Sequence, residues 1–386
     1  MEEKRIKASF LAINPFEESN VIQPVEHTSQ GSRYVTWGEG NLYPNFLFDL
    51  YQKCSTLQTV INGTVDFVCG DKINNLTKWQ KYCNRNCETI DEIIRQLAID
   101  ILIYGGGALN IINNRLGEPV EIYNIDFKNL RSDKKNHMFY FSEKFGKPLS
   151  EVTGRFYSNA TVTAIPAFDK DANNPSSVIY FKLNGKYSTY PNPIWSAAAT
   201  AAATEKKISE YHLNAISNGF ASNCIINLNN GVPTDEVKEE IEELLNDKYS
   251  GSENAGRPFI LYNIDKDHSA EVQRLDLEDF GDRYDSLAKW TRQQIFTAFR
   301  ANPNLFGINT ESNGFAQEDF ESPFKLFNKT VVSPIQKAIS GIFTKLTGDE
   351  DAISFEPFKI SFEKGEVDTR TVGSEGTENN SKNATI

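Results

Sequence analysis

Three long helical segments in the second half of the chain limit its fold more than any other feature. Residues 192–220 have a proline near the start, alanines through the middle and Asn218-Gly219 as a stop signal. Residues 277–300 and 316–347 each carry a stripe of apolar side chains at helical spacing. Pro334 lies inside the last segment, so a kink is expected near it. The sequence therefore predicts a second half built on long helices.

A small mixed unit separates the first two of these helices. Residues 224–228 and 258–263 have the composition of short strands. Between them, residues 235–247 form an amphipathic pattern that Thr234 can cap. The carboxylates of this segment are those of a solvent-exposed helix face rather than of a metal or acid–base site. The sequence predicts a strand–helix–strand unit here.

The first half of the chain is predicted to mix helices and strands. Residues 1–40 are polar and irregular and are interpreted as an arm, and residues 43–68 have the spacing of one amphipathic helix. Thr89 and Glu92 form a capping box that starts a further helix. Short strand candidates follow at 108–112, 120–125, 138–141, 160–165 and 178–183. Closely spaced strands beside helices indicate the α+β class.

Composition excludes several classes of function. The chain has 386 residues, 39% of them hydrophobic, which is enough for one large or two modest cores. A formal net charge of −12 argues against tight neutralisation of nucleic-acid phosphates, but not against a duplex that slides past. The charged N-terminal residues lack the apolar stretch of a signal peptide, and no apolar run approaches the ~18 residues of a membrane span. We expect no membrane association.

The glycine run in YGGGALNI is the feature most suggestive of an enzyme. A phosphate-binding loop places its glycines between a strand and a helix, so that helix N-terminal amides face the anion. Here the order is helix, glycines, strand, and the spacing of the known phosphate loops is missing. The pattern favours a helix C-cap, and a nucleotide-binding enzyme that uses Gly105–Gly107 stays the alternative.

Cysteine and histidine residues give little support for a metal or catalytic site. The chain has five cysteines, an odd number that suits a reducing compartment. Cys83 and Cys87 form one C-x3-C pair, but no second pair follows at zinc spacing. The four histidines are scattered, and no nucleophile elbow is present. We expect no metal, no cofactor and no catalytic residue.

Several stretches in the second half carry a family resemblance when taken in order. They are the alanine-rich helix that ends in NGF, then NCIINL, LLNDKYSGSENAGRPFILYN, QQIFTAFRANPNLFGI and FESPFKLFNKTVVSPIQKAI. In this order they resemble phage portal proteins of the HK97-like type. Upstream, LAIDILIYGGGALNIINNRLGEPVEIYNID is similar to the wing pattern of that family. The resemblance covers most of residues 90–350 and departs from the family at RANPNLFGI and at the glycine triplet.

The resemblance implies a portal-type α+β fold with a mixed α/β wing, long stem helices, a small α/β clip and a kinked long helix. The arm and wing would occupy residues 1–190 and the clip residues 222–275. The two stem helices would occupy residues 191–221 and 276–301. A tunnel loop would follow at 302–316, the kinked helix at 317–350, and a C-terminal strand with a disordered tail at 351–386.

By the same resemblance the protein is a non-enzymatic ring, typically of twelve subunits, at one vertex of a phage capsid. Double-stranded DNA would pass through the ring during packaging and ejection, without sequence specificity. Expected partners are the large terminase subunit, the major capsid protein and scaffold, and head-tail connector proteins. The location would be the virion, and the host cytoplasm during assembly. A non-portal head-tail adaptor is the remaining alternative, although adaptors are usually shorter and lack two stem helices.

Three groups of residues follow as candidates from this resemblance. The tunnel loop would present Arg300, Asn302, Asn304, Asn309, Glu311 and Asn313 to DNA. The clip would dock terminase and connectors through Asn223, Asn227, Asn229, Asn230, Glu239, Glu243 and Lys248. Small residues allow close helix approach, so the stem contact between subunits would involve Ala198, Ala201, Ala202 and Glu205. A polar loop rich in asparagine can make weak, exchangeable contacts with a moving DNA backbone, whereas the alternative is an ordinary surface connection.

Overall fold

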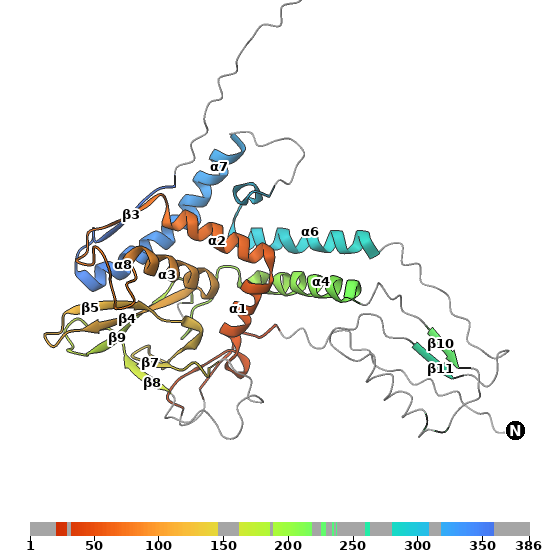
Figure 1. Ribbon diagram of the computed structural model, residues 1–386, viewed down its shortest axis with the longest axis horizontal. Coiled ribbons are helices and arrows are strands. Elements are labelled where there is room, and N and C mark those ends of the chain that lie inside the picture. Colours follow the sequence, from red (N-terminus) through yellow and green to blue (C-terminus); the bar gives the residue numbers. More distant parts are fainter. Residues whose placement is uncertain are drawn as a thin grey trace, which may run out of the picture.

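The computed structural model describes residues 21–28, 32–145, 162–185, 188–217, 225–228, 234, 237, 259–262, 280–308 and 318–358. Figure 1 shows a body of helices stacked on sheets, from which two long helices extend side by side. The body sheet has the antiparallel order β5-β4-β9, formed by β4 (Gly106–Asn113), β5 (Pro119–Asn124) and β9 (Ser176–Lys182). Helix α3 (Ile90–Tyr104) packs on this sheet, and α2 (Ser55–Cys69) and α8 (Ser333–Thr347) pack on α3.

Smaller sheets complete the body. An antiparallel sheet joins β6 (Leu130–Ser132), β7 (Met138–Phe141) and β8 (Thr163–Pro166). Strand β3 (Lys72–Asn75) pairs with β12 (Ile353–Glu356), and β1 (Glu26–His27) pairs with β2 (Thr36–Trp37). The strand predictions in the first half are therefore confirmed, with small shifts at their ends. Mixed helices and strands also confirm the α+β class.

The predicted helix over residues 43–68 is broken in the structure. Helix α1 (Tyr43–Lys53) ends where Cys54 adopts an extended conformation, and α2 starts at Ser55. Both helices bury the apolar positions that suggested a single helix, among them Leu47, Leu57 and Val65. The capping box of α3 is confirmed: the Thr89 side chain accepts from the Glu92 N–H, and the Glu92 carboxylate accepts from the Thr89 N–H.

The interpretation of residues 1–40 as an arm is wrong for the part that the structure describes. Trp37 is buried and its ring stacks on Tyr190, with centroids 4.6 Å apart. The Glu26 carboxylate accepts hydrogen bonds from the Thr189 and Tyr190 N–H groups, at 3.0 and 2.9 Å. Residues from the start of the chain are therefore part of the body, because aromatic burial outweighs their polar surroundings.

Arg131 holds the end of this N-terminal segment through hydrogen bonds to Asn41. Its side chain is fully buried and donates hydrogen bonds to the side-chain oxygen and the carbonyl of Asn41, and to the carbonyls of Lys128 and Leu130. Its guanidinium also lies over the ring of Phe145, 4.9 Å from the centroid. A buried cation held by oriented acceptors ties three distant segments of the body together.

The long C-terminal helix is irregular near the expected place. Helix α7 (Glu318–Phe327) passes into a π-helical turn, Asn328–Val332, before α8 continues from Ser333. Pro334 stands in the first turn of α8, where its missing N–H costs least. A π-helical turn is one of the recognised places at which a long helix bends. The structure places such a turn just before Pro334, and the kink expected there stays a prediction.

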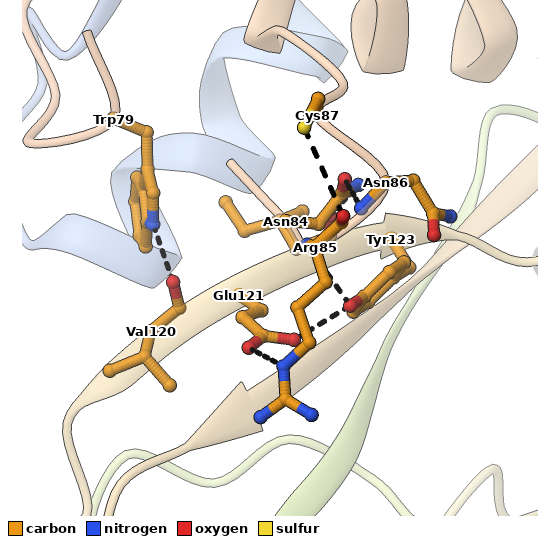
Figure 2. A network of polar contacts seen from close by, with 9 residues as sticks. Trp79, Asn84, Arg85, Asn86, Cys87, Val120, Glu121 and Tyr123 are labelled. Carbon is orange, nitrogen blue, oxygen red and sulfur yellow. Dashed lines mark hydrogen bonds and ion pairs between the residues drawn. The ribbon is translucent and has the colours of Figure 1, made fainter. Parts of the chain in front are cut away.

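A loop that follows β3 covers the outer edge of the body sheet. Figure 2 shows the indole of Trp79 donating to the Val120 carbonyl of β5, at 2.9 Å, and Arg85 paired with Glu121 at 2.8 Å. The Ile122 N–H donates to the Cys83 carbonyl, and the Asn84 amide donates to the Ile122 carbonyl. The edge strand therefore has backbone partners from this loop.

Candidate oligomerisation and channel surfaces

Two antiparallel helices project from the body at the positions predicted for the stem. Helix α4 (Ala199–Ser217) runs away from the body after a short 3-10 turn, Ser196–Ala198, and α6 (Phe280–Phe299) runs back toward it (Figure 1). Near their outer ends the ring of Tyr211 stacks on Tyr284, with centroids 5.2 Å apart. The two helices contact each other along the pair, and α4 also contacts α1.

The alanines at the start of α4 pack within the subunit. Ala198, Ala201 and Ala202 are buried within one chain, at 5%, 3% and 0% exposure. They lie where α4 meets α1 and α6. The close approach that these small residues permit is thus made within the subunit, and their contact with a neighbouring subunit stays a prediction.

Glu205 also makes hydrogen bonds within the subunit. One of its carboxylate oxygens accepts from the Ser55 hydroxyl at 2.9 Å and from the Thr56 N–H at 3.0 Å, both at the start of α2. A carboxylate from α4 thus caps a helix for which Cys54 supplies no side-chain cap. Within the subunit the residue fixes α4 on the break between α1 and α2, and its assignment to a subunit contact stays a prediction.

Lys206, the next residue, strengthens the contact between α4 and α1. Lys206 forms ion pairs with Asp49 of α1, at 2.6 Å, and with Glu210, at 3.8 Å. Burial acts to raise the pKa of Asp49, but hydrogen bonds from Lys206 and Lys53 outweigh it and lower the pKa below its usual range. Burial, followed by the charge of Glu205, raises the pKa of Cys54 to about 12. Cys54 is therefore a neutral, unreactive thiol.

The part of α6 nearest the body, together with the turn that follows it, contains no carboxylate. No Asp or Glu occurs from Ser286 to Thr310, although the chain has 52 acidic residues. Lys289, Arg292 and Arg300 are exposed on this stretch. Among the described residues none of these three cations forms an ion pair. This stretch is locally cationic in an acidic protein.

The first part of the predicted tunnel loop is a folded turn. Asn302 caps a 3-10 turn, Pro303–Phe306, by accepting from the Asn304 N–H at 2.9 Å. The side-chain oxygen of Asn304 is buried and has no hydrogen-bond partner among the residues that the structure describes. Arg300 is exposed and adopts a positive φ of 54° where α6 ends. Asn309, Glu311 and Asn313 lie outside the described residues.

Phe306 anchors this turn in a cluster of aromatic rings. Its ring lies 5.9 Å from Phe67 and from Phe327, measured between centroids, and 5.8 Å from Phe296. It also fills the space beside Gly63 of α2, where an added Cβ would come within 2.7 Å of the ring. The root of the loop is therefore packed against α2, α6 and α7, and sequence reasoning missed this anchor because its partners are distant in the chain.

The small unit between the stem helices is described only as a pair of strands. Strand β10 (Ile225–Leu228) pairs in parallel with β11 (Phe259–Tyr262), and Asn227 lies opposite Leu261. A parallel pair needs a crossover connection, which agrees with a strand–helix–strand order. The other clip candidates, Asn223, Asn229, Asn230, Glu239, Glu243 and Lys248, lie outside the described residues, as does most of the acidic helix expected at 235–247.

The glycine triplet leaves no room for a nucleotide. Gly105 ends α3 with a left-handed φ of 87°, and Gly106 starts β4. An added Cβ would lie 2.3 Å from the Asn192 carbonyl at Gly105, 2.3 Å from the Phe181 carbonyl at Gly106 and 2.5 Å from the Leu97 side chain at Gly107. The C-cap prediction is confirmed, and the alternative of a nucleotide loop is wrong because the chain itself occupies the space.

We expect Gly105→Ala to lower the free energy of unfolding by about 3 kcal/mol, which combines left-handed strain with a backbone clash. Gly307→Ala is the matched control, since Gly307 also has a positive φ of 75° but nothing within 4 Å of an added Cβ. The control is expected to lose only the left-handed cost of about 1 kcal/mol. Urea unfolding of both variants measures the difference, and equal losses would contradict the close packing.

Other candidate chemistry is weak in the part of the chain that the structure describes. No group of three or more His, Cys, Asp or Glu residues there could hold a metal ion. Cys83 is buried and Cys87 is exposed, with the Cys87 thiol 4.0 Å from the Arg85 carbonyl (Figure 2). Among the described helices, none is long and apolar enough to cross a membrane.

Comparison with known protein families decides the assignment. The family model described as phage portal protein matches residues 84–371, which is well over half of the chain. The chain belongs to the phage portal protein family. Portal proteins are structural components of the virion rather than catalysts. The sequence resemblance is thereby confirmed, and the non-portal adaptor has no further support.

Relatives of this portal protein are distant in sequence. An uncharacterized protein of Rickettsia bellii (strain RML369-C) is 27% identical over 170 residues, 43% of this chain and 42% of the relative. An uncharacterized protein of Rickettsia felis (strain ATCC VR-1525 / URRWXCal2) is 28% identical over 140 residues, 36% of this chain and 34% of the relative. The matched part spans less than half the length of these relatives.

Solved structures resemble this portal protein more extensively. A chain from the neck of a native gene transfer agent particle, computed with C12 symmetry, matches with a TM-score of 0.47 and 16% identity, over 81% of this chain and 84% of its own. An HK97 family phage portal protein from Corynebacterium diphtheriae matches with a TM-score of 0.45 and 11% identity, over 80% and 94%.

Proposed function

We propose that this portal protein assembles into a closed ring, of twelve subunits by expectation, at one vertex of a phage-type capsid. The ring is the conduit for double-stranded DNA during packaging and ejection. It has no catalytic activity of its own, and a separate motor supplies the energy. It reaches the virion after assembly in the host cytoplasm. Family membership and the projecting α4–α6 pair support this proposal.

The strongest support for a DNA conduit comes from residues 286–310, the part of α6 and the following turn that contains no Asp or Glu. A duplex has one negative charge per ~1.7 Å of its axis, so carboxylates beside its path would repel it. From Ser286 to Thr310 the chain places three exposed cations and no carboxylate. Three cations per subunit in an acidic ring give attraction that is weak and independent of sequence. Such a surface lets DNA pass without holding it.

In the proposed ring, the other candidate residues belong to the tunnel loop and to the unit that docks partner proteins. Arg300, Asn302 and Asn304 form the fixed root of a tunnel loop, and Asn309, Glu311 and Asn313 form its tip. The unit around β10 and β11 docks the large terminase subunit and later the head-tail connectors, with Asn223, Asn227, Asn229, Asn230, Glu239, Glu243 and Lys248 as contact candidates. The major capsid protein and scaffold surround the body.

Imaging of the purified protein tests the proposal. Electron microscopy of the full chain is expected to show closed rings with a central hole wide enough for a duplex. Countable rotational symmetry in the images would fix the number of subunits. A compact single subunit that persists at high concentration, or open filaments, would contradict the proposed function.

A further inference from the structure

A carboxyl group and an amide meet where α3 lies against β5, the outer strand of the body sheet. Asp100 stands one turn before the end of α3, and Asn124 is the last residue of β5. The Asn124 side-chain N–H donates to an Asp100 carboxyl oxygen at 2.9 Å. The Asn124 side-chain oxygen is buried and has no hydrogen-bond partner among the residues that the structure describes. A buried polar atom left unbonded is costly, so this oxygen requires a donor.

An ionised Asp100 cannot supply that donor. A carboxylate only accepts hydrogen bonds, so it pairs with the N–H of Asn124 and leaves the amide oxygen unbonded. Turning the amide end for end would place oxygen against oxygen and leave the amide nitrogen without its acceptor. A protonated carboxyl, by contrast, has both a donor and an acceptor, as the amide does. The two groups can then form a closed pair with one N–H···O and one O–H···O bond.

The surroundings of Asp100 favour the protonated form. Burial raises the pKa of Asp100 to about 8, although the hydrogen bond from Asn124 acts to lower it. The charge of Asp126, in the turn after β5, adds to the effect of burial. Lys128 favours the charged form, but it already pairs with Asp126 at 3.0 Å. On the same helix Tyr104 is neutral, because burial raises its pKa well above the usual value.

We propose that Asp100 keeps a proton at neutral pH and donates it to the Asn124 oxygen, so that two hydrogen bonds fasten α3 to β5 until the proton is lost to solvent. Loss of the proton breaks the O–H···O bond and leaves a negative charge near Asp126. Because α3 also carries α2 and α8, the contact that loosens is the one between the helical layer and the outer strand. This pH-sensitive joint acts within one subunit and does not depend on the proposed ring.

The sign of the pH dependence follows from this proton. The folded chain releases it at a pKa of about 8, against an ordinary value of 3.8. Between these values the folded chain holds more protons than the unfolded chain, so stability falls as the pH rises. For one proton, the ratio of unfolded to folded protein rises by up to about tenfold per pH unit. The stabilising effect is complete below the ordinary pKa and is lost as the pH passes the folded value.

Asp100→Asn tests the joint, because an amide at this position can accept from the Asn124 N–H and donate to its oxygen at every pH. Urea unfolding of the full chain at one fixed protein concentration is measured between about pH 5 and pH 8.5. The unmodified chain is expected to lose stability relative to this variant, with the ratio of their unfolding constants rising at least about tenfold. Asp66→Asn is the matched control, since Asp66 is an exposed carboxylate paired with Arg95 at 2.9 Å. It is expected to keep the slope of the unmodified chain.

Infrared spectroscopy detects the proton directly. A protonated carboxyl group has a C=O stretching band that carboxylates lack, and ordinary Asp and Glu side chains are ionised at about pH 7. The unmodified chain is expected to show this band at pH 7 and to lose it above about pH 9. Asp100→Asn is expected to lack the band. Asn124→Leu, which has a similar volume but no polar atoms, is expected to shift the band to higher frequency because the carboxyl loses both bonds.

Any of the opposite results would overturn the inference. These are the absence of a band from Asp100 at pH 7, equal pH slopes in Asp100→Asn and the unmodified chain, or an unshifted band in Asn124→Leu. If Asp100→Asn fails to fold, the infrared comparison of the unmodified chain with Asn124→Leu decides the question alone. Rings seen by electron microscopy would stand whichever way these measurements come out, so the two proposals fail separately.

Discussion

Shortening the loop within residues 309–314 is expected to leave rings intact and to reduce packaged DNA to background. The reason is that the proposed contacts with the moving duplex lie at the tip of the loop, whereas its root is packed independently. Deletions should spare residues 302–308, because Phe306 sits between Phe67, Phe296 and Phe327. Packaging assayed as nuclease-protected DNA per assembled particle, alongside electron microscopy of the rings, measures both properties.

A change elsewhere on the surface controls for this experiment. Lys134 and Lys135 are exposed in the turn between β6 and β7, and replacing both with Ser removes charge without touching the loop. This variant is expected to package DNA normally. Normal packaging by the shortened loop would show that the loop is only a surface connection, and broken rings would show that it belongs to the subunit contact.

Arg131→Ala is expected to lower the free energy of unfolding by about 3–5 kcal/mol, the largest stability loss we foresee for a single side chain. The substitution leaves carbonyls of Asn41, Lys128 and Leu130 without their donor in a dry interior and opens a cavity beside Phe145. Urea unfolding at one fixed protein concentration gives the value from the shift of the midpoint.

Arg85 provides a control of the same residue type. Its side chain is 84% exposed and pairs with Glu121 on the surface, so Arg85→Ala is expected to cost under ~1 kcal/mol. Arg131→Lys separates charge from geometry, since an ammonium keeps the cation but cannot reach the same set of acceptors. If Arg131→Ala lowered the free energy of unfolding only as much as Arg85→Ala, the proposed role of Arg131 in holding these segments together would be contradicted.

Local signals in the sequence were sufficient wherever partners lie close along the chain. The capping box at Thr89 and Glu92, the glycine C-cap after Tyr104 and the strand at Met138–Phe141 depend on neighbouring residues, and all were predictable. The two long helices α4 and α6 were likewise predictable from their helical patterns. The break at Cys54 was not predictable, because the residue that caps α2 is Glu205, about 150 positions later.

The same limit applies to the alanine run from which a contact between stems was predicted. The alanine run correctly indicated that something approaches α4 closely, but a run of small residues does not say what approaches it. In the structure the partners are α1 and α6 of the same chain. Similarly, the polar sequence around Trp37 concealed its burial, because its contacts with Tyr190 and Phe127 lie far along the chain.

Outward backbone groups at both borders of the body sheet have partners from the same chain. The Trp79–Glu88 loop bonds to β5, and on the other side Phe168 donates its N–H to the carbonyl of Val178 in β9. These contacts occupy part of each row of backbone groups through which one newly made copy could pair its strands with another.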